Sequence, residues 1–100
     1  MSVNVMTLYR VEPDFIEEAL ALSREITKAN LELGAEQLVL SQIITGQYTG
    51  CWLATMRAPD MATIEKVLQA LPDNEHFKVL VQSGKVTLIS RNFANVAEGF

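Results

Sequence analysis

His76 is the only histidine of the chain, and its imidazole is the one side chain that titrates near neutral pH without help from its surroundings. Such a group can accept or donate a proton in general acid–base catalysis. The phenol of Tyr9 is a second candidate proton acceptor. The simpler interpretation of His76 is a solvated residue on a helix, flanked by Glu75 and Lys78. The sequence alone leaves both interpretations open.

The sequence contains no set of residues that suits a metal or a cofactor. With one histidine and one cysteine, Cys51, the chain cannot assemble the Cys and His ligands of a usual zinc site. The G-x-S-x-G, H-E-x-x-H, P-loop and dinucleotide-binding patterns are also missing. We therefore expect no cofactor. A single cysteine in a β-rich stretch is most often a small buried hydrophobe, which fits a reducing, cytoplasmic setting.

Other residue types could hold a substrate. Trp52 and Tyr9 would suit an aromatic pocket in which a planar substrate stacks, although both types are also common in cores and dimer interfaces. Arg91 could bind a carboxylate or a phenolate, and the alternative is an ordinary surface ion pair. Ser90 is an uncharged polar residue in an otherwise apolar strand. If it is buried, it must hydrogen-bond to another side chain or to a ligand.

Composition and charge exclude several classes of protein. The 100 residues, 49% of them hydrophobic and 20% charged, predict one globular domain over residues 1–100. The net charge is -4 and the eight basic residues form no cluster, so we expect no nucleic-acid partner. The chain does not begin with a signal-like segment, and no stretch approaches the roughly 20 apolar residues that span a bilayer. We therefore predict a protein that is neither exported nor inserted in a membrane.

Hydrophobic periodicity predicts the elements that position these residues. The expected order is strand (2–11), helix (13–33), strand (36–45), strand (51–57), helix (60–71) and strand (85–93). The segment 73–82 is ambiguous between helix and strand, and we favour a short helix capped by Asp73. In the last strand, simple alternation places Val86, Leu88 and Ser90 on one face and Thr87, Ile89 and Arg91 on the other.

This order predicts a ferredoxin-like α+β fold, βαββαβ. Right-handed crossovers and a short hairpin give a four-stranded antiparallel sheet of order 4-1-3-2 with both helices on one face. Along each strand, the residues of both faces include aliphatic side chains. A sheet with one face in water would instead alternate regularly between apolar and polar residues. We therefore expect a second copy of the chain to cover the other face, as a homodimer.

With these features the chain resembles the dimeric α/β-barrel superfamily. The resemblance rests on the element order, the two-sided apolar strands and the run LPDNEHFKVLVQSGKVTLISRNF, which is similar to the usual ending of the family. Antibiotic-biosynthesis-type monooxygenases, stress-responsive barrel proteins and NIPSNAP-like proteins belong to this superfamily. The resemblance implies two sheets paired face to face into an α/β barrel. In the monooxygenase branch it implies oxidation of polycyclic or quinol-like substrates without metal or flavin.

A haem-degrading branch of the superfamily uses an asparagine, a tryptophan and a histidine. Asn4, Trp52 and His76 are the residues here that resemble this triad. Their registers differ from the pattern of that branch. Its tryptophan falls where this chain has Met56 and Arg57, and its asparagine lies later in the first strand.

Taken together, the sequence predicts a small dimeric α/β-barrel protein that binds a hydrophobic or aromatic metabolite. One alternative is a cofactor-independent monooxygenase, and another is a non-catalytic stress-response or assembly module. Whether the chain is an enzyme stays open. The candidate residues are His76 and Tyr9 for catalysis, and Trp52, Asn4, Arg91 and Ser90 for substrate binding.

Overall fold

The computed structural model describes residues 1–100. The chain forms four strands and three α-helices, with short 3-10 turns at Pro13–Phe15 and Leu71–Asp73. The elements are β1 (Val3–Val11), α1 (Ile16–Glu32), β2 (Gln37–Gln42), β3 (Trp52–Ala58), α2 (Met61–Ala70), α3 (Glu75–Gln82) and β4 (Val86–Asn95). No helix combines the length and the apolar character that a membrane crossing requires.

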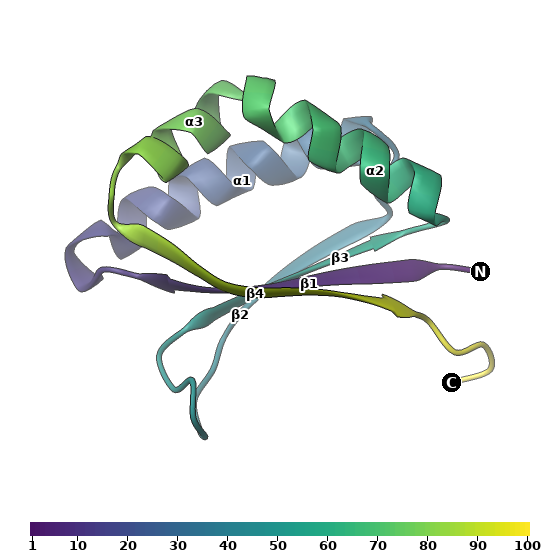
Figure 1. Cartoon of the computed structure of the whole chain (residues 1–100), viewed down its shortest axis with the longest axis horizontal. Coiled ribbons are helices and arrows are strands. Elements are labelled where there is room, and N and C mark those ends of the chain that lie inside the picture. Colours follow the sequence, from purple (N-terminus) through teal and green to yellow (C-terminus); the bar gives the residue numbers. More distant parts are fainter.

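All strands pair antiparallel, in the order β2-β3-β1-β4. Figure 1 shows the three helices in one layer on one face of this sheet, and the other face bare. The β2–β3 connection projects away from the helix layer (Figure 1). The predicted ferredoxin-like fold and its strand order are therefore confirmed, as is the short helix in the ambiguous segment.

Side-chain caps fix where the two later helices begin. The carboxylate of Asp60 accepts hydrogen bonds from the Thr63 amide at 2.8 Å and from the Thr63 hydroxyl at 2.7 Å, as expected for an N-cap. At α3 the cap is Asn74, whose Oδ1 accepts from the Phe77 amide at 3.0 Å. The prediction that Asp73 caps this helix is wrong. Asp73 still belongs to the 3-10 turn that follows Pro72.

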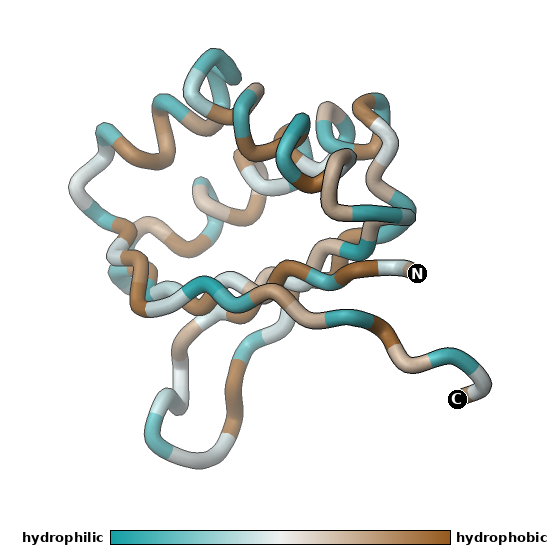
Figure 2. Tube along the Cα trace, turned by 45° about the vertical axis from the view of Figure 1, so that its right-hand side comes forward, coloured by the Kyte–Doolittle hydropathy of each residue, from teal (hydrophilic) through white to brown (hydrophobic).

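Apolar side chains between the helices and the sheet form two separate clusters. Figure 2 shows hydrophobic segments on the helix turns that face the sheet. One cluster joins α2 to the sheet, and the other joins the start of α1 to β1. Their members are Val3, Val5, Ala35, Met56, Ala58, Ile64 and Val67 in the first, and Tyr9, Val11, Phe15 and Ala19 in the second. The layers are thus joined at two places.

A β-bulge changes the register of β4. Leu8 lies opposite Ser90 and the next residue of β1, Tyr9, lies opposite Leu88, so Ile89 has no partner on β1. The predicted alternation of β4 is therefore wrong beyond Leu88. Because the bulge adds one residue, Arg91 shares the helix-covered face with Leu88, and Ser90 lies on the bare face.

The bare face of the sheet carries both apolar and polar side chains. Leu8 is only 8% exposed although no helix covers it, and Met6 and Leu53 are half-buried. Asn4 lies opposite Arg57 on the same face. The sequence-based view that both faces of β1 are substantially apolar therefore fits the structure.

We expect Ile64→Ala to lower the free energy of unfolding by about 2 to 5 kcal/mol, because Ile64 is 0% exposed and its removal leaves a cavity against the sheet. Ile64→Val should cost about 1 kcal/mol. Urea unfolding followed by circular dichroism measures both changes. The control is Val79→Ala, at a residue of α3 that is 53% exposed. It should change the free energy of unfolding by less than about 0.5 kcal/mol. Equal effects of the two alanine substitutions would contradict this location of the core.

Candidate functional site

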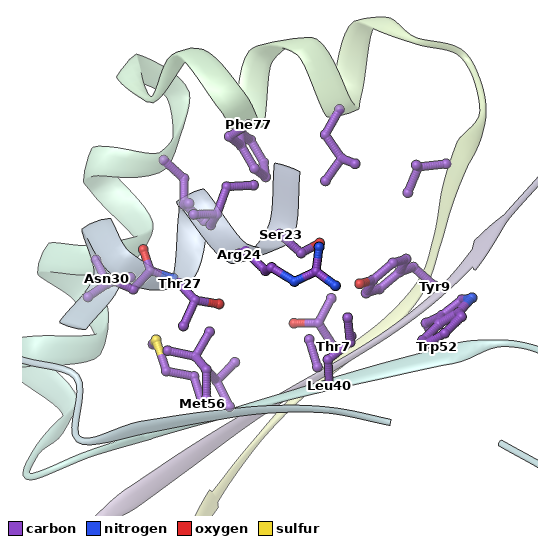
Figure 3. Close-up of a pocket in the computed structure, with 18 of the residues that line it drawn as sticks. Thr7, Tyr9, Ser23, Arg24, Thr27, Asn30, Leu40, Trp52, Met56 and Phe77 are labelled. Atoms are coloured by element: carbon purple, nitrogen blue, oxygen red, sulfur yellow. The ribbon is translucent and has the colours of Figure 1, made fainter. Parts of the chain in front are cut away.

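A cavity of about 880 Å³ lies between the helices and the sheet. Its walls include members of both apolar clusters, Val5, Met56 and Val67 from the first and Tyr9 from the second. Of the 25 residues that line it, 18 are hydrophobic, so its surface favours an apolar ligand over water. Figure 3 shows side chains from the helices and from the sheet pointing toward one another across this space.

Five of the polar groups of the wall lie on α1, one on the central strand β1 and one on the edge strand β4. The remaining seven lining residues are Thr7, Ser23, Arg24, Thr27, Lys28, Asn30 and Arg91. Three of them are cationic and none is acidic. The cavity is therefore an apolar chamber whose charged groups are all of one sign.

Arg91 is held in place by a hydrogen bond across β1 and β4. Its Nε donates to Oγ1 of Thr7 at 3.2 Å, and the two residues are register partners. This contact exists because the bulge at Ile89 turned Arg91 to the helix-covered face. The hydrogen bond uses the side of the guanidinium and leaves its terminal nitrogens available to a ligand.

The Tyr9 hydroxyl points into the cavity toward the guanidinium of Arg24, which comes from the opposite wall (Figure 3). Tyr9 is 9% exposed. Burial raises the pKa of its phenol, and the Ser23 hydroxyl opposes this shift in part. The Ser23 hydroxyl already donates its proton to the Ala19 carbonyl at 2.7 Å, so it is not free to stabilise a Tyr9 phenolate by a hydrogen bond. Tyr9 is therefore protonated at neutral pH and acts as a hydrogen-bond donor.

Trp52 is the cross-strand neighbour of Tyr9 and forms the next part of the wall. Figure 3 shows the indole beside the phenol ring. The Nε1 atom of Trp52 is buried without a hydrogen-bond partner. An unpaired buried donor of this kind costs about 1 to 3 kcal/mol. Trp52 therefore combines an aromatic surface with an unused donor.

The structure brings together three of the residues singled out from the sequence and separates the other three. Tyr9, Trp52 and Arg91 line one cavity. Asn4 and Ser90 lie on the bare face of the sheet.

His76 is exposed on α3, on the Glu25 side of α1, and is not among the cavity residues. Any role of Asn4, Ser90 or His76 would have to be played outside the cavity, and Asn4 and Trp52 lie on opposite faces of the sheet. The structure therefore does not assemble the Asn, Trp and His residues at one site. No three His, Cys, Asp or Glu side chains lie close enough together to hold a metal ion.

Sequence reasoning missed the contribution of α1. Ser23, Thr27 and Asn30 follow one another at spacings of four and three, which places them on one helix face, and all line the cavity. Asn30 is 6% exposed, the only buried polar residue of the chain. This polar stripe beside the apolar one was the feature of the sequence that could have predicted a polar wall on α1. The sequence contained no such indication for Arg24, because a charged residue next to an apolar stripe is usually solvated.

Comparisons with known proteins identify a family and a fold. The sequence model of a family described as "Domain of unknown function (DUF6854)" matches residues 4–96. No curated protein has significant sequence similarity to the chain.

Solved structures share the fold at low identity. A conserved protein from Methanosarcina mazei Go1 is similar with a TM-score of 0.73 and 14% identity, over 94% of this chain and 91% of that one. A protein described as an antibiotic biosynthesis monooxygenase is similar with a TM-score of 0.67 and 18% identity, over 95% of this chain and 98% of that one. A NIPSNAP family protein from Agrobacterium tumefaciens is similar with a TM-score of 0.68 and 11% identity, over 99% of this chain and 96% of that one. At these identities the likeness is one of fold, and it agrees with the superfamily resemblance seen in the sequence.

We expect Tyr9 to form its phenolate only above the ordinary value of 10.0, because burial raises its pKa. Ultraviolet titration of a Tyr48→Phe variant, in which Tyr9 is the only tyrosine, measures this directly. Because the pKa of Tyr9 is higher in the folded state than in the unfolded one, its contribution to the free energy of unfolding is fully present below pH 10.0. This contribution is lost as the pH rises through the folded pKa. Titration at or below the ordinary value would show that the phenol is not buried as described.

Proposed function

We propose that this chain, which belongs to the family described as "Domain of unknown function (DUF6854)", binds a small hydrophobic or aromatic metabolite between its helices and its sheet. The observation that carries the proposal is the cavity of about 880 Å³. Protein interiors are close-packed, with few voids larger than a water molecule. This space is open to solvent on one side and mostly apolar, and its volume lies within the ordinary range of ligand pockets, about 300 to 1,000 Å³.

The side chains of the wall favour an aromatic ligand. Tyr9, Trp52 and Phe77 all line the cavity, and they come from β1, β3 and α3. Rings contributed by three different elements can contact a planar molecule from more than one side. The donors of Tyr9 and Arg91 would then orient the polar end of the ligand.

A cofactor-independent monooxygenase is the enzymatic alternative, favoured by the fold shared with a protein described as an antibiotic biosynthesis monooxygenase. In this alternative Trp52 forms part of the substrate wall, and Tyr9 or His76 accepts a proton. Tyr9 is the better placed of the two, because it lies in the cavity and His76 does not. Its raised pKa works against this role at neutral pH, since a protonated phenol donates rather than accepts. Ligand binding without catalysis is therefore the first proposal.

The bare face of the sheet is proposed to pair with a second copy of the chain, giving a homodimeric barrel. Support comes from the partly buried apolar side chains of Met6, Leu8 and Leu53, which no helix covers. Polar residues such as Asn4 would hydrogen-bond within this interface. If the cavity proved to be filled or inert, the dimer surface itself would be the function, as in an assembly or stress-response module.

The ligand proposal predicts that filling the cavity abolishes binding. Ala54 lies opposite Thr7 and lines the cavity, so Ala54→Phe places a ring where the ligand would sit. Trp52, the only tryptophan, reports binding by its fluorescence when an aromatic probe such as 1-naphthol is titrated. We expect saturable quenching in the wild type and none in the variant, with unfolding stability retained or increased.

Ala62→Phe, at an exposed position of α2, is the matched control and should bind like the wild type. Loss of quenching in both variants, or in neither, would contradict a site in this cavity.

The dimer proposal predicts a particle of twice 11.1 kDa in light scattering at micromolar concentration. Met6→Glu places a charge on the bare face and should shift the particle toward the monomer, because an unpaired charge is costly in an apolar interface. Val79→Glu on α3 makes the same chemical change in the helix layer and should leave the mass unaltered. A monodisperse wild-type species of 11.1 kDa would sink the dimer proposal.

A further inference from the structure

The charges around the cavity are distributed unevenly. The chain has 12 acidic and eight basic residues, yet none of the acidic residues lines the cavity and three of the basic ones do. A protein with a net charge of -4 thus has a locally cationic cavity that is open to solvent. Electrostatic complementarity of this kind favours an anionic ligand over neutral ones.

Two of these cations have no internal counter-ion. The ion pairs of the chain join Lys28 to Glu25, Arg57 to Glu36 and Lys85 to Asp14, and neither Arg24 nor Arg91 takes part in one. Both guanidiniums line the same low-polarity cavity. Both side chains are exposed to solvent at the edge of the cavity, so each keeps its positive charge there without an internal partner. A bound anion would supply the missing counter-ion.

The geometry of the polar groups suits a carboxylate in particular. The Nε of Arg91 is fixed on Thr7, so its terminal nitrogens form a pre-oriented fork, the arrangement that matches two carboxylate oxygens. Arg24 reaches into the cavity from α1, on the opposite wall, and the Tyr9 hydroxyl points toward it (Figure 3). These groups are donors, as a carboxylate requires, and most of the remaining wall is apolar.

We infer that the ligand is an organic acid with an apolar, ring-containing body, whose carboxylate is held by Arg24 and Arg91 with a hydrogen bond from Tyr9. This inference rests on the proposed function, because it names the class of ligand for the same cavity. It makes Arg24 and Arg91 the residues that set specificity. Lys28 has a smaller part, since it is already paired with Glu25 at 3.0 Å.

Calorimetric titration with a matched pair of probes, 1-naphthoate and its methyl ester, tests the inference. The two share the naphthalene ring system, and the ester replaces the charged carboxylate by a neutral group that is larger by one methyl. We expect the acid to bind at least about tenfold more tightly, because hydrogen bonds between ionised groups contribute more than neutral ones. Added salt should weaken binding of the acid and leave the ester unaffected.

Substitutions identify the groups responsible. Arg24→Gln and Arg91→Gln should each reduce the affinity for the acid by about tenfold or more and leave the affinity for the ester unchanged. Lys66→Gln removes a charge from an exposed position of α2 outside the cavity and serves as the control, with no effect on either probe.

The possible failures are distinguishable. Equal affinity for acid and ester, or equal losses for both probes in the arginine variants, would overturn the inference and leave a hydrophobic site standing. Binding of neither probe would contradict the inference and the proposed function together.

Discussion

The antiparallel pairing of β1 with both β3 and β4 is the constraint on which the rest of the structure depends. Side chains alternate along a strand, so this central position fixes which residues of three strands share a face. Val5, Thr7 and Tyr9 face the helices, and Leu8 faces the bare side. The cavity and the proposed dimer surface are therefore two sides of one strand, and a one-residue slip would exchange them.

The helix layer meets the sheet at two apolar clusters rather than along its whole length. One is anchored by Ile64 and Val67 of α2, and the other by Phe15 and Ala19 near the start of the first long helix. The cavity has members of both clusters in its walls, and α1 presents a polar stripe to it. We infer that a ligand completes the packing that the chain leaves unfinished.

The sequence predicted the element order, the strand order and the faces of β1, because these follow from periodic apolar spacing and short connections. It also identified Tyr9, Trp52 and Arg91 as candidates, and the structure places these residues around one cavity. It did not reveal that Arg91 faces the helices. That depends on the bulge at Ile89, which is a property of the pairing with β1 and has no local signature. Arg24 was missed for a similar reason: it is exposed, as a charged helix residue is expected to be, and only the tertiary packing places a cavity beside it.

The central claim is that the space between helices and sheet holds an organic ligand. A crystal structure of the protein purified from its native host tests it most directly. The account predicts electron density for a ring-containing molecule beside Tyr9 and Trp52, with its acidic end between Arg24 and Arg91. A cavity closed by the protein's own side chains, with no such density, would contradict it.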